Sequence, residues 1–230
     1  MIDGVQTASQ FRDLTVAEFV RRLSSAEPVP GGGSASAIAA ALAASLVAMV
    51  ASLSEGRPKY AAHAELHARV GPAARRLADR LLVLADDDAA AYAGFAAALK
   101  LPRESDAERA LRTTAMQEAA RVAAEIPLRC VEACLEVVVL AESLAGRSNV
   151  NASSDLNVAA LLAEAGGRGA AANVLVNLPS VGDQAWAGEA RLQVDDLLRT
   201  LGHIAAQTRE VVQGGDARDP IEPSDLPVHA

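Results

Sequence analysis

Residues 28–34, Pro-Val-Pro-Gly-Gly-Gly-Ser, stand directly before an uncharged run that extends from Ala35 to Ser54. Prolines and glycines of this kind do not form helix interior, because proline lacks the amide donor and glycine loses the most backbone entropy on ordering. Ser34 is a suitable N-cap, and the alanine-rich run after it has the highest intrinsic helix propensity. The sequence therefore predicts a turn and then a long helix that begins at Ser34.

The glycines before this helix permit two interpretations. One is a tight turn between two helices. The other is a binding site, because glycines let a ligand approach the backbone and a helix N-terminus favours an anion. The stretch lacks the Lys-Ser/Thr of a P-loop and the spacing of a dinucleotide fingerprint. Both interpretations stay open, and Gly31, Gly32, Gly33 and Ser34 are candidate binding residues.

Composition limits the partners of this 230-residue chain. The net charge of -8 and the sequence pI near 5.0 provide no basic footprint, so we expect no nucleic-acid partner. No basic stretch followed by an apolar one begins the chain, which predicts a cytoplasmic protein. The run from Ala35 to Ser54 is long enough to span a membrane, but its many alanines and serines favour a buried central helix, and we expect no membrane partner.

The apolar periodicity is helical throughout, and no segment alternates with a period of two. We expect helices over residues 15–26, 34–54, 59–99, 105–144, 155–178 and 183–213, with bends near Pro72 and Pro127. The prediction is an all-α fold, a single-domain bundle of about six helices over residues 1–213. Gly214, Gly215 and three later prolines predict a loosely ordered tail over residues 214–230.

Some side chains could carry chemistry. Asp88 and Tyr92 share one helical face that continues to Phe95, and an inward carboxylate would have a raised pKa suited to acid/base work. A solvated acidic face is the alternative. Lys100 ends the same helix and either takes part in catalysis or complements the helix dipole.

A second polar group lies further along the chain. Asn149, Asn151 and Asp155 crowd one connection, and Asn177 shares a helical face with Asn173. These side chains could bind either a ligand or the backbone. Cys130 and Cys134 are expected to be core thiols, and His63 and His67 a surface face, so no metal site is predicted.

The order of these motifs is more specific than any one of them. The motifs are the stretch 28–34 before an alanine-rich helix, Arg57-Pro58-Lys59-Tyr60, Asp88 with Ala91-Tyr92, Lys100-Leu101-Pro102, Pro127-Leu128, Asn151 through Asp155-Leu156, and Asn173 to Asn177-Leu178. Over about residues 14–212 the chain resembles the cyclodeaminase/cyclohydrolase family. This family comprises the cyclodeaminase part of formiminotransferase-cyclodeaminase and stand-alone bacterial methenyltetrahydrofolate cyclohydrolases.

The resemblance implies a homodimeric folate enzyme with its site in a cleft between subunits and no cofactor beyond the tetrahydrofolate substrate. We expect hydrolysis of 5,10-methenyltetrahydrofolate to 10-formyltetrahydrofolate. The alternatives are release of ammonia from formiminotetrahydrofolate and a non-catalytic helical scaffold. The implied catalytic residues are Asp88, Lys100 and Asp155. The implied substrate-binding residues are Gly31, Gly32, Gly33, Ser34, Arg57, Lys59, Tyr60, Tyr92, Asn149, Asn151 and Asn177.

Overall fold

The structure is a computed structural model that describes residues 10–222 and 224–227. In this part of the chain every regular element is a helix, and no strand occurs. The α-helices are α1 (Val16–Leu23), α2 (Gly32–Ser54), α3 (Ala64–Leu99), α4 (Asp106–Leu144), α5 (Ser153–Asn177) and α6 (Gln184–Gly214). Short 3-10 helices are η1 (Phe11–Asp13), η2 (Pro58–His63), η3 (Val150–Ala152) and η4 (Leu178–Ser180). The prediction of an all-α domain with about six helices is confirmed.

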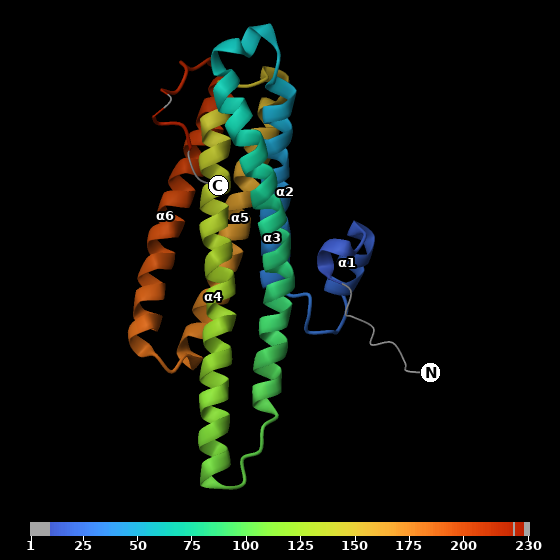
Figure 1. The fold of residues 1–230 in the computed structure, drawn as a ribbon, viewed down its shortest axis with the longest axis vertical. Coiled ribbons are helices and arrows are strands. Elements are labelled where there is room, and N and C mark those ends of the chain that lie inside the picture. Colours follow the sequence, from blue (N-terminus) through green and yellow to red (C-terminus); the bar gives the residue numbers. More distant parts are fainter. Residues whose placement is uncertain (1–9, 223, 228–230) are drawn as a thin grey trace.

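Helices α2 to α6 form one elongated bundle, and α1 stands apart from it beside α2 and α3 (Figure 1). Helix α2 packs on α3 and α5, and α4 packs on α3, α5 and α6. Helices α3 and α4 extend beyond the other helices at one end of the bundle (Figure 1). Gly33 at the start of α2 faces Asp88 of α3, so the bundle places the glycine stretch beside the predicted carboxylate.

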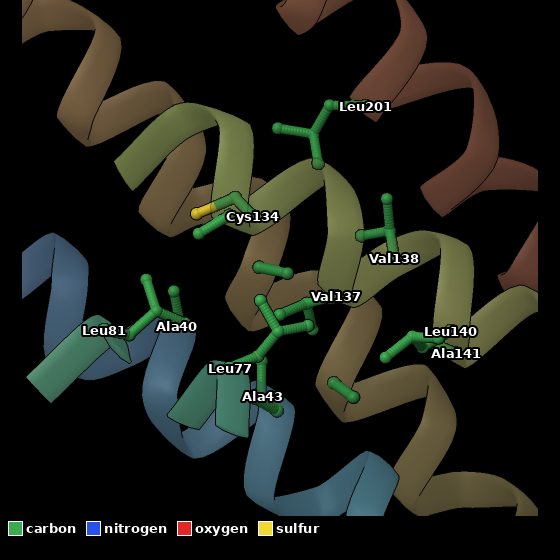
Figure 2. Close-up of a cluster of buried hydrophobic side chains, with 14 of the residues drawn as sticks. Ala40, Ala43, Leu77, Leu81, Cys134, Val137, Val138, Leu140, Ala141 and Leu201 are labelled. Atoms are coloured by element: carbon green, nitrogen blue, oxygen red, sulfur yellow. The ribbon is translucent and has the colours of Figure 1, made fainter. Parts of the chain in front are cut away.

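Small residues allow the central helices to approach closely. Ala40 and Ala43 of α2 are fully buried, and a Cβ added at Gly166 of α5 would lie 2.8 Å from the carbonyl oxygen of Ser36. In Figure 2 the larger side chains around these alanines come from α3 and α4. By length and composition α2 could cross a membrane, but 56% of its most apolar window is buried in the bundle. It is therefore the core helix that the sequence predicts.

Two local predictions are wrong. Helix α2 begins at Gly32 with Gly31 as its N-cap, so Ser34 lies inside the helix and does not cap it. Its hydroxyl instead reaches oxygen atoms of α3, which a local propensity argument does not include. His67 is fully buried and its Nε2 lies 2.9 Å from the carbonyl oxygen of Arg147, so His63 and His67 do not form a surface face.

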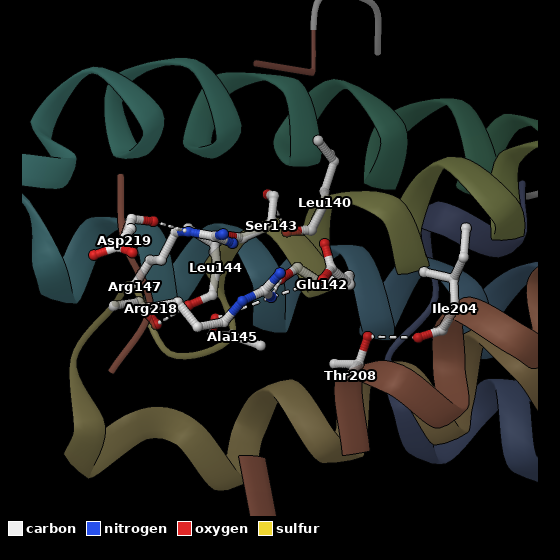
Figure 3. Close-up of polar contacts among 11 residues, drawn as sticks. Leu140, Glu142, Ser143, Leu144, Ala145, Arg147, Ile204, Thr208, Arg218 and Asp219 are labelled. Atoms are coloured by element: carbon white, nitrogen blue, oxygen red, sulfur yellow. Dashed lines mark hydrogen bonds and ion pairs between the residues drawn. The ribbon is translucent and has the colours of Figure 1, made fainter. Parts of the chain in front are cut away.

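The described part of the C-terminal tail folds back on the end of α4 (Figure 3). The Arg218 amide donates to the Gly146 carbonyl at 2.9 Å, and the Arg218 guanidinium pairs with Glu142 at 2.7 Å. Arg147 donates to the carbonyl oxygen of Asp219 at 2.6 Å. Leu226 is buried against the core. These contacts hold the described tail residues more closely than their glycine and proline content indicates.

The close approach of α2 and α5 predicts opposite effects for two glycine substitutions. Gly166→Ala should lower the free energy of unfolding by about 1–3 kcal/mol, because the new methyl meets backbone that cannot move without separating the helices. Gly188→Ala in α6 has nothing within 4 Å of the new methyl. This substitution should raise the free energy of unfolding by about 0.4–1 kcal/mol. Urea denaturation measures both. Equal effects would show that the two helices do not depend on this contact.

Candidate active site

A cavity of about 350 Å³ lies where the start of α2 meets the later half of α3 and the end of α5. Its lining combines exposed backbone, one carboxylate, two aromatic rings and two amides. The residues are Pro28, Val29, Gly31, Gly32, Gly33, Asp88, Ala91, Tyr92, Phe95, Ala123, Asn173, Val176 and Asn177. Six of the predicted site residues thus meet in one place, and Ser34 lies directly behind them.

The start of α2 presents backbone amides to this cavity. Gly31 is the N-cap and supplies no side-chain hydrogen bond to the first amides of the helix. The first amide bonded in the usual way is that of Ala35, which donates to the Gly31 carbonyl at 3.0 Å. Gly32 and Gly33 line the cavity without side chains. A ligand can therefore approach amide donors at the positive end of a 23-residue helix.

Asp88 is half-buried on α3 and is bonded to α2. The Ser34 hydroxyl lies 3.0 Å from Asp88 Oδ2 and 3.0 Å from the Ala85 carbonyl oxygen. Burial raises the pKa of Asp88 above its ordinary value, and the hydrogen bonds from Ser34 oppose that rise. A Cβ added at Gly33 would collide with this carboxylate, so glycine leaves the room that Asp88 occupies. Asp88 is thus a carboxyl group prepared to exchange a proton.

The end of α5 supplies two asparagines. Asn177 Nδ2 donates to the carbonyl oxygens of Ala123 at 2.9 Å and Asn173 at 2.8 Å. Both of its amide hydrogens are used, so its side-chain oxygen is the group left for a ligand. Asn173 Nδ2 donates to the Gly169 carbonyl at 2.9 Å and keeps one hydrogen. The sequence-based site left out Asn173 and Phe95, although both share a helical face with a predicted residue.

Most of the other predicted residues lie at the opposite end of α2. Tyr60 is buried, and its hydroxyl oxygen accepts a hydrogen bond from the Val150 amide at 3.0 Å. Lys59 and Tyr60 line a second cavity of about 140 Å³. Asn151 and Asp155 stand in and just after η3, close in sequence to that cavity. With 23 residues at 1.5 Å each, the length of α2, about 35 Å, separates the two groups in one protomer.

Three predicted residues stand outside the first cavity for separate reasons. Asn149 is buried. Its side-chain oxygen accepts a hydrogen bond from the Asn151 backbone amide at 3.1 Å, and its own backbone amide donates to Ser54 Oγ at 2.8 Å. Those bonds fit a structural link between α2 and η3. Lys100 is the C-cap of α3, twelve residues beyond Asp88, which is about 18 Å along the helix. Arg57 is exposed as the N-cap of η2.

The raised pKa of Asp88 predicts a pH-dependent stability. The folded protein holds this proton more tightly than the unfolded chain, so the contribution of Asp88 is fully present below about pH 4 and is lost as pH rises through the folded pKa. Asp88→Asn cannot ionise. Its free energy of unfolding, relative to the parent, should therefore increase from pH 4 to about pH 7 in urea titrations.

Asp87→Asn is the control, because it removes one negative charge from the same helical turn. An Asp88→Asn difference that stays flat with pH, or that matches Asp87→Asn, would contradict the raised pKa.

Similarity to known proteins identifies the family. The family model for formiminotransferase-cyclodeaminase matches residues 15–196. The methenyltetrahydrofolate cyclohydrolase of Methylorubrum extorquens is 38% identical over 200 residues, which are 86% of this chain and 96% of that protein. The formimidoyltransferase-cyclodeaminase of Rattus norvegicus is 35% identical over 187 residues, 81% of this chain but 35% of that protein, so the chain spans about a third of its length.

A solved structure shows the same fold. The crystal structure of formiminotetrahydrofolate cyclodeaminase from Thermotoga maritima superposes with a TM-score of 0.80 at 24% identity, covering 88% of this chain and 98% of that one. The family match extends over most of the chain, and the cyclohydrolase relative is similar over nearly its full length. The chain therefore belongs to the formiminotransferase-cyclodeaminase family.

Proposed function

We propose that this protein is a folate one-carbon enzyme that hydrolyses 5,10-methenyltetrahydrofolate to 10-formyltetrahydrofolate. The observation that carries the proposal is Asp88, a half-buried carboxyl with a raised pKa inside the cavity at the start of α2. The similarity to the stand-alone cyclohydrolase along 96% of that protein's length supports this reaction over others.

The reaction needs one group that can accept and return a proton. Water adds to the carbon between N5 and N10, which becomes tetrahedral, and the bond from this carbon to N5 then breaks. One water proton ends on N5 and the other is released. Ionised Asp88 accepts a proton from the attacking water and then donates it to N5 as that bond breaks. A carboxyl whose pKa is raised by burial suits both steps better than an ordinary aspartate.

The cavity lining fits a folate in outline. Tyr92 is 46% exposed and stands with Phe95 on the Asp88 face of α3, where two rings can contact the planar part of the substrate. Asn173 and Asn177 offer one amide hydrogen and one oxygen to its polar edge. The backbone amides at the start of α2 are donors for an anionic group.

A dimer accounts for exposed apolar side chains on α2 and α5. Helix α2 contains no acidic or basic residue, yet Leu42 near its middle is 55% exposed, and Leu161 of α5 is 48% exposed. The same face continues through Met49, Leu53, Val158 and Val176, all exposed. α1 adds Val16 and Val20. An apolar surface of this extent is typical of a subunit interface, and we assign it to a second copy of the chain.

A two-fold axis would join the two groups of predicted residues. α2 and α5 run antiparallel, because Gly166 lies beside Ser36 while Asn149 bonds Ser54 at the other end. An axis perpendicular to α2 near Leu42 places the start of α2 beside the end of α2 in the partner. The Asp88 cavity is then completed by Lys59 of the partner subunit and Asp155 of the partner subunit. Their charges would bind the glutamate carboxylates and stabilise the cationic bridge.

The second candidate reaction is the release of ammonia from formiminotetrahydrofolate. It is favoured by the 35% identity to the rat formimidoyltransferase-cyclodeaminase. N10 would attack the formimino carbon, and the tetrahedral intermediate would expel ammonia after protonation. The same carboxyl can supply that proton. Both reactions pass through a tetrahedral carbon between N5 and N10. The first adds water to this carbon, and the second releases ammonia from it.

Offering purified protein each folate separately distinguishes the reactions. The methenyl absorbance should disappear when methenyltetrahydrofolate is supplied, and its appearance from formiminotetrahydrofolate would favour the cyclodeaminase. Asp88→Asn keeps the shape of the side chain but cannot exchange a proton, so turnover should fall by about 10²–10⁴ with little change in KM. Two flat assays with a folded parent protein would favour a scaffold instead.

Mixing two inactive variants tests the composite site. Asp88→Asn and Asp155→Asn should each be inactive as homodimers. After unfolding and joint refolding in equal amounts, about half of the dimers are hybrids with one intact site, so activity should return to about a quarter of the parent value. Each variant refolded alone is the control. Hybrids that are isolated and remain inactive would place both carboxylates in the site of one protomer.

A further inference from the structure

Ser34 stands behind the cavity and not in it. It is fully buried, and the cavity is lined by Gly31, Gly32 and Gly33 but not by Ser34. Its hydroxyl oxygen is 3.0 Å from Asp88 Oδ2 and 3.0 Å from the Ala85 carbonyl oxygen. A substrate in the cavity would therefore meet Asp88 and the glycines, while Ser34 touches the far side of the carboxyl group. This position differs from the anion-binding N-cap that the sequence predicts.

The chemistry of a hydroxyl allows two arrangements at this point. A serine hydroxyl has one hydrogen and two lone pairs, so it donates to only one of the two oxygens at a time. When Asp88 is ionised, Ser34 donates to the carboxylate. When Asp88 carries a proton, the carboxylic acid can donate to Ser34 Oγ while Ser34 donates to the Ala85 carbonyl. Neither state leaves the buried hydroxyl without a hydrogen-bond partner, which would be unfavourable.

We propose that Ser34 is a positioning residue that holds the Asp88 carboxyl in place in both of its protonation states, by exchanging the donor and acceptor roles of its hydroxyl. The inference rests on the proposed function, in which Asp88 takes up and returns one proton per turnover. Ser34 acts through Asp88 and does not bind the substrate. Gly33 belongs to the same arrangement, because a side chain there would displace the carboxylate towards the cavity.

Charged groups near this contact are already paired or point elsewhere. On α3, Asp86 accepts from the Phe11 amide at 2.6 Å and lies 3.5 Å from Arg12. On α4, Arg121 pairs with Glu125 and Asp183. The start of α2 and the end of α5 contribute no charged side chain to the cavity, and Asp87 lines a separate groove between α3 and α4. The Ser34 hydroxyl is thus the polar side chain that bonds the Asp88 carboxyl among the described residues.

Ser34→Ala tests the proposal through catalysis, with Ser36→Ala as a matched control. Ser36 is a buried hydroxyl two residues away that donates to the Gly32 carbonyl at 2.7 Å. Ser34→Ala should lower kcat by about ten- to a hundredfold, since a hydrogen bond to a charged group is lost, with KM nearly unchanged. Ser36→Ala should stay near the parent value. Melting temperatures establish that both variants fold.

The pH profile and a double-mutant cycle separate positioning from substrate contact. Ser34→Ala should shift the acidic limb of the kcat–pH profile to higher pH. The reason is that the side-chain hydrogen bond from Ser34, which the substitution removes, lowers the pKa of Asp88. In an Asp88→Asn background the same substitution should have no further effect on turnover. A raised KM that persists in the Asp88→Asn background would overturn the proposal and make Ser34 a substrate contact.

A measurement without substrate keeps the inference separate from the proposed reaction. Carbon-13 NMR of the aspartate carboxyls follows the titration of Asp88, whose signal is assigned by its loss in Asp88→Asn. The pKa of Asp88 should be higher in Ser34→Ala than in the parent and unchanged in Ser36→Ala. An unchanged value in Ser34→Ala would overturn the role of Ser34. A protein that shows the shift but turns over neither folate would overturn the proposed function alone.

Discussion

The close approach of α2 to its neighbours is the constraint on which this structure depends. Alanine, serine and glycine let backbones meet where larger side chains would separate them, as at Gly166 against Ser36. The core is accordingly filled by larger residues from α3 and α4, such as Leu77 and Val137, packed onto an alanine-rich helix (Figure 2). Dispersion contacts between close backbones replace the aromatic side chains that this chain uses sparingly.

The same proximity creates the chemistry of the cavity. Because α2 and α3 lie close at the start of α2, Asp88 is desolvated and meets the Ser34 hydroxyl across the helix interface. A few ångströms of additional separation would hydrate the carboxyl and restore an ordinary pKa. Glycine at position 33 makes the arrangement possible, since any Cβ there would occupy the space of the carboxylate. Stability and reactivity therefore depend on the same small residues.

The bundle also divides the polar residues between its two ends. Asp88 and Asn177 belong to one end, and Tyr60 and Asn151 to the other, with the length of α2 between them. A helical rod does not bend to join its ends, so the two groups stay apart within one protomer. Antiparallel pairing of two rods is the simplest geometry that brings unlike ends together. The exposed apolar residues of α2 and α5 form the surface that we propose for such pairing.

The sequence by itself determined the helices, because periodicity, caps and proline positions are local properties. The starts of the helices near residues 15 and 105 and the core character of α2 are examples. It also indicated the family, which the family-model match over residues 15–196 confirms. Only the tertiary structure decided which residues of different helices contact each other. Ser34 was expected to cap α2 and His67 to face solvent, yet both are buried and bonded across the bundle. Such contacts join positions more than fifty residues apart, and local spacing carries no information about them.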